Sequence, residues 1–388
     1  MLKITIDATP IQPNASGVGL YVTNLIRSLH PLQVKEKFQL SIAYQPGLKN
    51  WLRRNISPPK SLNIDSQVHI VPIPVRISNI LLSLPSNWMV SNYFEKHLDE
   101  PDILQGTNYY VYPCRNTLKI MNIYDLTFIK FPDYTNSVVK TYNKRVKKCL
   151  QWTDLVLTIS ESSKKDIVEY LGVDPQRIYV TPLASRYYSG YLSEDLAHQM
   201  EASSEYDFSK PYLLFVSTLE PRKNINNLIR AFNLLKRKHK IEHQLVLIGQ
   251  KGWNYQPIFR EIESSAWRGQ IYHLDYLSDE MVAAFYSKAD VFVYPSHYEG
   301  FGLPVLEAMT LGAPVITSNT SSLPEVAGDA ALLIDPNDPA SLADAILKVI
   351  SDSQLRSELI QKGKERAKLF SWERTAQETL KAYKSLLA

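Results

Sequence analysis

This 388-residue sequence has few cysteines, no long apolar run and only a small excess of charge of one sign. Its two cysteines, Cys114 and Cys149, lack metal-site spacing and are too few for a disulfide framework, which fits a reducing compartment. No run approaches the roughly 18 apolar residues of a membrane-spanning helix, and the first residues lack the features of a signal peptide. The sequence therefore predicts a cytoplasmic protein.

The charge balance excludes one class of partner. Lysine and arginine number 43 against 39 aspartates and glutamates, a net charge of +4. This excess is too small to indicate nucleic acid, although it permits weak attraction to anionic substrates or membrane surfaces. The length, together with 45% apolar residues, suits two globular domains rather than a single core.

Apolar runs alternate with helical patterns along the chain, which predicts an α/β fold with mainly parallel sheets covered by helices. Ligands of such sheets bind beyond the carboxyl ends of the strands. A polar stretch at 189–210 is the expected linker, so we place domains at 1–205 and 206–370 and a final helical segment at 371–388. The expected strands lie at 2–6, 38–43, 68–73, 103–105, 118–124, 155–159, 178–181, 212–217, 243–249, 270–274, 291–295, 314–317 and 331–334.

Gly17 and Gly19 follow the first strand and a proline-containing loop, and they lead into a helical pattern at 20–29. A strand, a glycine loop and a helix in this order let a backbone approach a diphosphate. The full G-x-G-x-x-G spacing is absent, so a tight turn explains the two glycines comparably well.

Two segments of the first half could touch a membrane. Segment 77–89 (ISNILLSLPSNWM) is apolar and contains Trp88. A basic helix beside an apolar patch can dock on anionic lipid, which would place the protein at the inner face of a membrane. The alternative is a solvated basic face. The basic segment, 140–148, contains Lys140, Lys144, Arg145, Lys147 and Lys148.

Arg222 and Lys223 lie between an expected strand and the start of a helix. Cations near a helix N-terminus oppose its dipole, which costs free energy unless an anion is bound. Their placement therefore indicates a clamp for a diphosphate, which arginine can hold through two hydrogen bonds. The alternative is a surface charge pair with Glu220.

Residues 296–308 (SHYEGFGLPVLEA) connect an expected strand to a helix with Pro304 in its first turn. The N–H groups of this connection and the positive end of the helix dipole suit an anion. Glu299 and Glu307 are better acceptors for sugar hydroxyls than ligands for phosphate. An exposed loop acid and a helix-surface acid are the alternative. The loop consists of Gly300, Phe301, Gly302 and Leu303.

These residues resemble the E-x7-E signature of retaining nucleotide-sugar glycosyltransferases of family 4. That family has the GT-B fold, two Rossmann-like domains with mainly parallel sheets facing each other across a cleft. The resemblance continues through 307–338 and includes TLEPRKN at 218–224. It is strong in the second half of the chain and weak in the first. It implies an N-terminal acceptor-binding domain, a C-terminal nucleotide-sugar-binding domain and a last helix that crosses back to the first domain.

The resemblance implies transfer of a hexose from a nucleotide-diphosphate sugar to a hydroxyl of a glycan or lipid-linked acceptor, with retention of anomeric configuration. Arg222 and Lys223 would stabilise the departing diphosphate. Glu299 would hold hydroxyls of the donor sugar, and Glu307 those of the ribose. Neither metal nor cofactor is implied, in agreement with the absence of a D-x-D signature. The motifs favour mannose from GDP-mannose, as in polysaccharide biosynthesis, with UDP- and dTDP-sugars as alternatives.

The resemblance also places Gly17 and Gly19 near the acceptor, and Tyr276 and Leu277 in the region that frames the nucleotide base. Tyr124 stands where many relatives have His, in a run that keeps Asp125. We expect both Tyr124 and Asp125 at the site, but a tyrosine is a poor base at neutral pH, and a packed tyrosine at a strand end is equally compatible.

Two other functions stay open on the sequence alone. A phosphorylase or nucleotide-sugar epimerase could share this architecture, although no lysine stands out as an anchor for pyridoxal phosphate. A non-catalytic nucleotide-sugar or glycan-binding protein is the second, and the departure at Tyr124 favours it.

Overall fold

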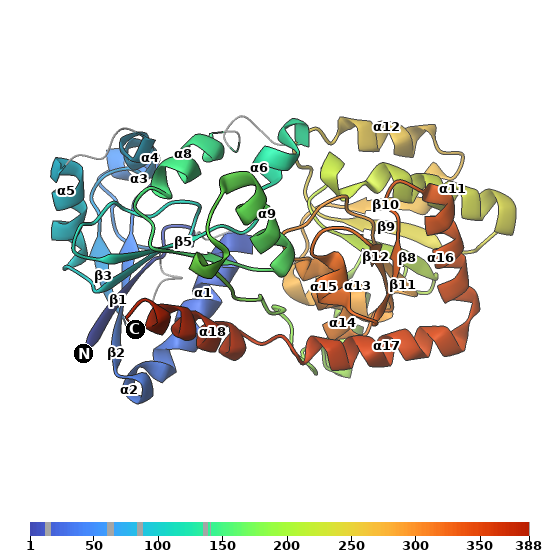
Figure 1. Ribbon diagram of the computed structural model, residues 1–388. Helices are drawn as coiled ribbons and strands as arrows, with labels where there is room; N and C mark the ends of the chain where they lie inside the picture. The colour runs from blue at the N-terminus through green and yellow to red at the C-terminus, as the bar shows by residue number, and fades with distance from the viewer. Residues whose placement is uncertain (12–16, 60–65, 84–87, 135–138, 140, 388) are drawn as a thin grey trace. The chain divides into compact units, whose positions relative to one another are not determined.

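The computed structural model describes residues 1–11, 17–59, 66–83, 88–134, 139 and 141–387. The chain divides into two compact units (Figure 1). Unit 1 comprises Met1–Pro132, Ser137–Leu183 and Trp372–Ala388, and unit 2 comprises Asp133–Asn136 and Ala184–Ser371. The division after Leu183 lies before the 205/206 boundary expected from the sequence, and the final helix belongs to unit 1.

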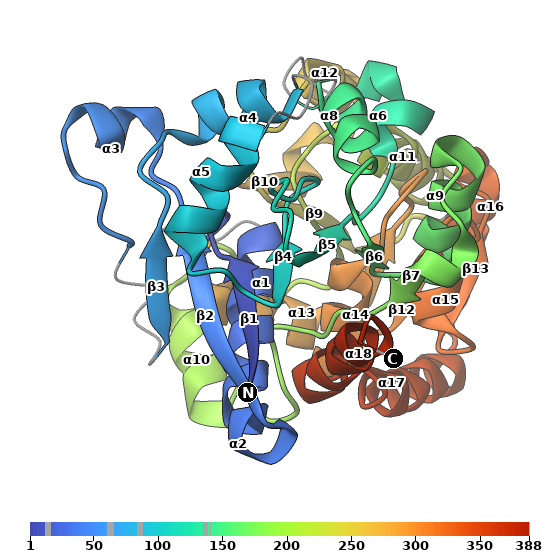
Figure 2. The same ribbon diagram turned by 60° about the vertical axis from the view of Figure 1, so that its left-hand side comes forward.

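Unit 1 is built on a seven-stranded sheet with the order β3-β2-β1-β4-β5-β6-β7, which Figure 2 shows from left to right. Every neighbouring pair is parallel. Parallel neighbours require crossover connections, which explains the helices between strands. The strands are β1 (Leu2–Asp7), β2 (Phe38–Tyr44), β3 (Gln67–Ile70), β4 (Ile103–Gly106), β5 (Leu118–Asn122), β6 (Leu155–Thr158) and β7 (Ile178–Val180).

The described helices of unit 1 cover this sheet, and the last of them, α18, lies beside α1 (Figure 1). The rings of Tyr21 on α1 and Trp372 on α18 are 6.4 Å apart, and the Tyr383 hydroxyl donates a hydrogen bond to Gln105 Oε1. The helices are α1 (Gly17–Leu29), α2 (Gln33–Glu36), α3 (Leu48–Leu52), α4 (Val75–Ser83), α5 (Trp88–Leu98), α6 (Thr127–Lys130), α8 (Tyr142–Cys149), α9 (Glu161–Leu171) and α18 (Trp372–Ser385).

Unit 2 contains a six-stranded parallel sheet with the order β10-β9-β8-β11-β12-β13. Its central strand β11 is buried at all four positions, as expected for a parallel sheet covered on both faces. The strands are β8 (Tyr212–Val216), β9 (Gln244–Ile248), β10 (Ile271–Leu274), β11 (Val291–Tyr294), β12 (Val315–Ser318) and β13 (Ala331–Ile334). The helices are α10 (Glu194–Ser203), α11 (Ile225–His239), α12 (Gln256–Ser264), α13 (Asp279–Lys288), α14 (Leu303–Leu311), α15 (Leu323–Ala327), α16 (Pro339–Ser351) and α17 (Ser353–Ala367).

The α/β fold class is confirmed, and every expected strand range overlaps an observed strand. Two local expectations were wrong. Gly17 and Gly19 lie within the first turn of α1 rather than in a loop before it, because the packing of α1 against α18 outweighs the low helix propensity of glycine. The segment read as a linker contains α10, which packs on α13 and begins after Ser193, whose side chain caps the helix at Leu196 N. Within the described residues, no helix has the length and apolar character to cross a membrane.

Candidate functional site

The connection from β11 to α14 has a shape set by Gly302 and Ser322. Gly302 precedes the helix with φ +111°, and a Cβ there would lie 2.8 Å from Leu323 Cδ2. The Ser322 hydroxyl lies 2.9 Å from Glu299 O and 2.8 Å from Phe301 O, which fixes the loop backbone. Helix α14 begins at Leu303 and has Pro304 in its first turn, as the sequence predicts. The N–H groups of Val305 and Leu306 donate to the Gly302 carbonyl at 3.0 and 3.3 Å. The N–H groups ahead of them, at 300–303, lie outside the hydrogen-bonding pattern of the helix itself. They are suited to an anion.

Glu299 is buried in this loop and lies between the two predicted cations. Its Oε2 accepts a hydrogen bond from Arg222 Nη1 at 2.8 Å, and its Oε1 accepts one from Lys223 Nζ at 2.7 Å. The hydroxyls of Tyr294 and Ser296 contact the same Oε1 at 2.9 and 2.7 Å. The structure therefore brings Glu299, Arg222 and Lys223 together into one cluster.

The two cations reach Glu299 from the short turn Pro221–Lys223 between β8 and α11. Arg222 also donates to the Tyr298 carbonyl at 2.6 Å and to Glu220 Oε1 at 2.8 Å. Lys223 is buried and donates a second hydrogen bond to the Tyr294 hydroxyl at 2.8 Å. The sequence analysis predicted that cations at a helix start need an anion beside them. In the ligand-free protein that anion is the carboxylate of Glu299.

Charge dominates over burial at Glu299. Burial by itself would raise its pKa, but Arg222 and Lys223 outweigh that effect and lower the pKa to about 2. Burial and the neighbouring Arg222 together lower the pKa of Lys223. Glu299 is thus ionised throughout the physiological range, and it holds the cations in place in the ligand-free protein.

Glu307 lies on α14 and has a separate set of partners. Its side chain is buried, and its Oε1 accepts a hydrogen bond from Arg186 Nε at 2.7 Å. Its Oε2 lies 3.5 Å from the Tyr286 hydroxyl on α13. Burial raises the pKa of Glu307 above its ordinary value, and Arg186 opposes this shift. Sequence reasoning missed Arg186, because no motif links it to a carboxylate 121 residues away.

Tyr276 and Leu277 follow β10, at the carboxyl edge of the unit 2 sheet. Tyr276 is 76% exposed, and Leu277 is half-buried. Ser278 then caps α13 by accepting a hydrogen bond from Met281 N at 3.2 Å. An exposed ring on a fixed connection can provide a stacking surface for a planar group.

Known proteins match this chain along its length. Residues 199–366 match the family described as glycosyl transferases group 1. The O-antigen chain mannosyltransferase B of Escherichia coli is 31% identical over 392 residues, which cover 99% of this chain and 100% of that protein. The chain belongs to the group 1 glycosyltransferases.

Solved structures agree with this glycosyltransferase in fold. Sucrose-phosphate synthase from Thermosynechococcus elongatus matches with a TM-score of 0.72 at 19% identity, covering 100% of this chain and 99% of that chain. Anabaena Alr3699/HepE in complex with UDP and glucose also gives 0.72, at 15% identity, covering 99% and 100% of the two chains. The fold is therefore GT-B. The family match and the Escherichia coli relative show that the chain is a transferase enzyme.

In unit 1 of the glycosyltransferase, Tyr124 is buried. Its ring packs edge-on against Tyr21 and Tyr109, at 5.5 and 5.6 Å, and its hydroxyl donates to the Thr107 carbonyl. Burial and the neighbouring tyrosines raise its pKa well above the ordinary value. This geometry gives Tyr124 a packing role and makes it unsuited to accept a proton.

The other unit 1 residues singled out by the sequence lie at element starts. Asp125 is half-buried, and its Oδ1 accepts a hydrogen bond from Thr127 N at 3.0 Å, next to the start of α6. Gly17 is exposed, and a Cβ there would meet nothing within 4 Å, whereas Gly19 is buried. The loop before Gly17, at 12–16, lies outside the described residues.

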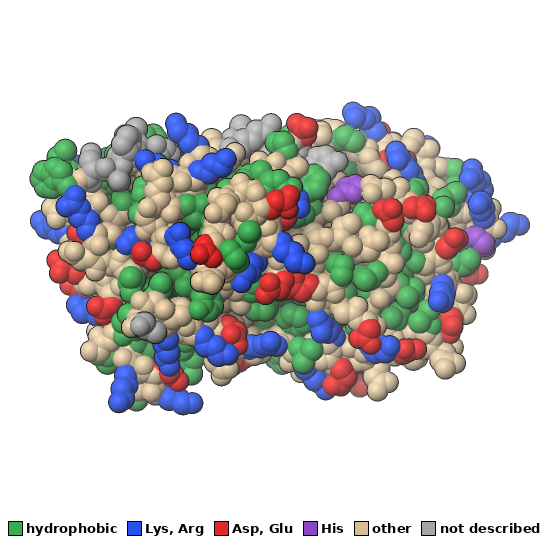
Figure 3. Space-filling model, viewed as in Figure 1, with side chains coloured by type: hydrophobic (Ala, Val, Ile, Leu, Met, Phe, Trp, Pro, Cys, Tyr) green, Lys and Arg blue, Asp and Glu red, His purple; other side chains and the backbone are tan. Residues whose placement is uncertain are grey.

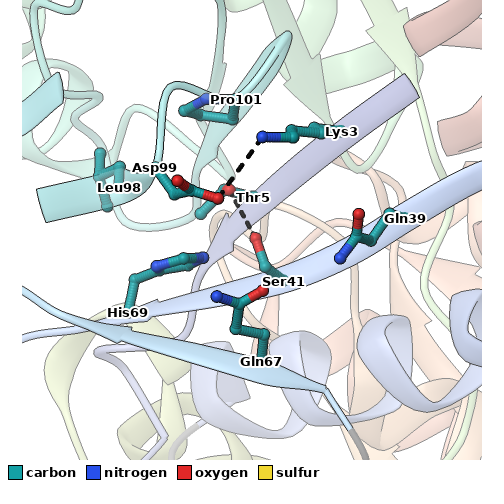
Figure 4. A pocket seen from close by; sticks show the side chains of 9 residues that line it. All are labelled: Lys3, Thr5, Gln39, Ser41, Gln67, His69, Leu98, Asp99 and Pro101. Atoms are coloured by element: carbon teal, nitrogen blue, oxygen red, sulfur yellow. Dashed lines mark hydrogen bonds and ion pairs between the residues drawn. The ribbon is translucent and has the colours of Figure 1, made fainter. Parts of the chain in front are cut away.

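A small polar cavity occurs elsewhere on unit 1, between the first three strands and the end of α5 (Figure 4). Lys3 and Asp99 form an exposed ion pair at 3.5 Å there, and the Thr5 and Ser41 hydroxyls lie 2.7 Å apart. None of the predicted site residues lines this cavity. In the part of the chain that the structure describes, no three His, Cys, Asp or Glu side chains are placed to hold a metal ion.

Proposed function

We propose that this glycosyltransferase moves mannose from GDP-mannose to a hydroxyl of a glycan or lipid-linked acceptor, retaining the anomeric configuration and using no metal ion. The observation that carries the proposal is the position of Glu299 between Arg222 and Lys223, beside the start of α14. The mannosyl assignment is supported by the full-length Escherichia coli relative. A UDP- or dTDP-sugar is the alternative donor.

The donor diphosphate would take the place of the Glu299 carboxylate as the partner of Lys223. Arg222 would stay anchored to Glu220 and to the Tyr298 carbonyl while it shares its remaining hydrogen bonding with phosphate. Negative charge grows on the diphosphate as the bond to the anomeric carbon breaks. One preorganised donor aimed at such charge is typically worth about 3 kcal/mol. These cations would supply the positive charge that a metal ion supplies in other enzymes.

The carboxylate released from Lys223 would then accept hydroxyls of the donor sugar. Glu307 would accept the ribose hydroxyls, the N–H groups at 300–303 would face the diphosphate, and Tyr276 and Leu277 would frame the base. The acceptor would bind unit 1 near Gly17, Gly19 and Asp125. We assign no side-chain base, because Tyr124 is committed to the Thr107 carbonyl; the departing phosphate would help to remove the acceptor proton.

A panel of nucleoside diphosphates tests the donor. A ligand that binds only the native state raises the melting temperature, so GDP should stabilise the protein more than UDP, dTDP or ADP do. A metal chelator should leave GDP binding and GDP-mannose turnover unchanged. NMR of the product should show the α-configuration of the donor. Stabilisation by UDP alone would show that the donor is a UDP-sugar rather than GDP-mannose. Loss of turnover with the chelator would show that the enzyme needs a metal ion.

We also propose that unit 1 contacts anionic membrane through a docking face formed by α3, α4, α5 and α8. Trp51, Leu52, Ile80 and Trp88 are exposed on the first three of these helices. Arg145 links α8 to α4 through Asn79 Oδ1 at 3.0 Å. Figure 3 shows hydrophobic and basic side chains gathered at the end of unit 1 that carries α3, α4 and α5. The exposed cations are Lys49, Arg53, Arg54, Arg76, Lys144 and Lys147.

The structure removes one cation from the predicted basic segment, because Arg145 is buried over the rings of Tyr110 and Tyr142. Lys140 and residues 84–87 lie outside the described residues. Co-sedimentation with phosphatidylglycerol vesicles should be strong, and with phosphatidylcholine vesicles weak. Lys144→Gln and Lys147→Gln should each weaken binding about fivefold, following roughly 1 kcal/mol per cation. Leu52→Ser should weaken binding, while the exposed Leu369→Ser in unit 2 is the control. Equal binding to both vesicles would contradict the proposal.

A further inference from the structure

Arg186 connects two carboxylates of unit 2 that differ in exposure. Its Nε donates to Glu307 Oε1 at 2.7 Å, and its Nη1 donates to Asp279 Oδ1 at 2.9 Å. The side chains of Arg186, Asp279 and Glu307 are 37%, 57% and 2% exposed. Arg186 thus reaches from the surface to an acid that is almost completely removed from water.

The surroundings of Glu307 provide little other support for its charge. The titratable groups that face it are Arg186, Asp279, Tyr187 and Tyr286. Asp279 repels a carboxylate, and burial raises the pKa of Tyr286 well above its ordinary value, so that this phenol stays neutral. Among the described groups that face Glu307, Arg186 is therefore the one cation.

We propose that Arg186 is a positioning residue of the nucleotide site, which fixes Oε1 of Glu307, keeps the carboxylate charged and so leaves Oε2 to accept ribose hydroxyls. The inference rests on the proposed function of Glu307 as the ribose acceptor. Asp279, at the start of α13, holds the other end of the guanidinium and prevents it from turning away. Tyr187, the next residue along the chain, fixes the same segment through its hydroxyl, which donates to the Asp279 carbonyl at 3.1 Å.

The consequence of losing Arg186 follows from burial. A carboxyl group that is buried without a cation can have a pKa of roughly 8–9, so Glu307 would become largely protonated at pH 7. A protonated carboxyl group carries an O–H that must itself find an acceptor. It also accepts hydrogen bonds from the two ribose hydroxyls more weakly than an ionised carboxylate does. Nucleotide affinity would then depend on pH, increasing as the pH rises and the group ionises.

The test compares the dissociation constant of GDP for the wild type and Arg186→Gln by calorimetry between pH 7.0 and 8.5. The ratio of the two constants at each pH cancels the titration of GDP itself. We expect Arg186→Gln to bind about tenfold more weakly at pH 7.0, which corresponds to one pKa unit, and to recover as the pH rises. Arg186→Lys should restore most of the affinity. Arg230→Gln, which removes an exposed ion pair with Glu261 on the same unit, is the matched control.

A loss of affinity that is the same at every pH would show a merely structural role, and an unchanged affinity would show no role; either result overturns the inference. Failure of the proposed function looks different, because Glu307→Ala would then bind GDP as the wild type does.

The ligand-free protein gives an independent measurement. A carboxyl whose folded pKa is raised destabilises the fold as pH rises through that pKa. Arg186→Gln should therefore lose thermal stability from pH 6 to pH 9 relative to the wild type, and the double variant Arg186→Gln/Glu307→Gln should not.

Discussion

Replacing Glu299 by glutamine tests whether charge holds the cation cluster together. The substitution keeps the size of the side chain but removes the charge that contacts Arg222 at 2.8 Å and Lys223 at 2.7 Å. Lys223 then stays buried and Arg222 half-buried without that carboxylate, although Arg222 keeps its ion pair with Glu220. We expect unit 2 to lose stability at neutral pH.

Two arguments give a similar magnitude for this loss. Removing one partner of a buried ion pair typically costs about 3–5 kcal/mol. Independently, the pKa of Glu299 falls from 4.5 to about 2. At 1.36 kcal/mol for each pKa unit, that depression contributes about 3 kcal/mol to the free energy of unfolding. Because the folded pKa is the lower one, the contribution is fully present above the unfolded pKa and is lost as the pH falls toward the folded value.

Hydrogen exchange of peptides from β8 and β11 at pH 7 measures the effect, since these strands report the opening of unit 2 itself. The opening free energy should fall by about 3 kcal/mol in Glu299→Gln. Glu261→Gln is the matched control, because its partner Arg230 is 53% exposed and such pairs are worth about 0–1 kcal/mol. If Glu299→Gln opened no more readily than Glu261→Gln, the cluster would not be held by charge.

Three further outcomes follow from the same contacts. Calorimetry should show that Glu299→Gln binds GDP about tenfold more tightly, since the substitution removes the carboxylate that competes with the diphosphate for Lys223. Turnover of GDP-mannose should fall steeply in the same variant. Weaker GDP binding would contradict the exchange of the Glu299 carboxylate for the diphosphate. Lys223→Met should weaken GDP binding about tenfold to a hundredfold, because a hydrogen bond to a charged group is worth about 1.5–3 kcal/mol; an unchanged dissociation constant would exclude Lys223 from the phosphate site. Tyr124→Phe should lower the melting temperature through an unsatisfied Thr107 carbonyl but leave the pH profile of kcat unchanged; a lost basic or acidic limb would restore Tyr124 to the chemistry.

The sequence predicted features that depend on neighbouring residues. The strand β11, the loop after it and the start of α14 follow from an apolar run, two glycines and Pro304. The caps of two other helices are local in the same way, since Ser160 accepts from Ser163 N and Asp338 accepts from Ala340 N and Ser341 N. Local hydrogen bonding and periodicity determine all of these, so one sequence is enough to find them.

Partners that lie far apart in the chain could not be predicted in this way. The contacts of Glu299 with Arg222 and Lys223 cross 77 and 76 residues, and the sequence identified these residues as a site without showing that they bond to one another. Arg186 carried no signal at all, because its role depends on where β11 and α14 place Glu307. Gly17 shows the opposite failure. The helix was expected from residue 20, but packing of α1 against α18 extends it back to Gly17 despite the low helix propensity of glycine.

The two proposed ligand contacts of unit 2 share one electrostatic arrangement. A site for a diphosphate needs positive charge, but a buried cation without an anion costs folding free energy. Glu299 offsets that cost in the free protein, and exchange of its carboxylate for phosphate would leave the number of charge pairs unchanged. At Glu307 the signs are reversed, since the buried carboxylate that we propose as the acceptor of hydroxyls is paired with Arg186. The difference is that phosphate, an anion, would compete with Glu299, whereas ribose, a neutral ligand, would not displace Arg186. Nucleoside diphosphate affinity should therefore rise when Glu299 is neutralised and fall when Arg186 is.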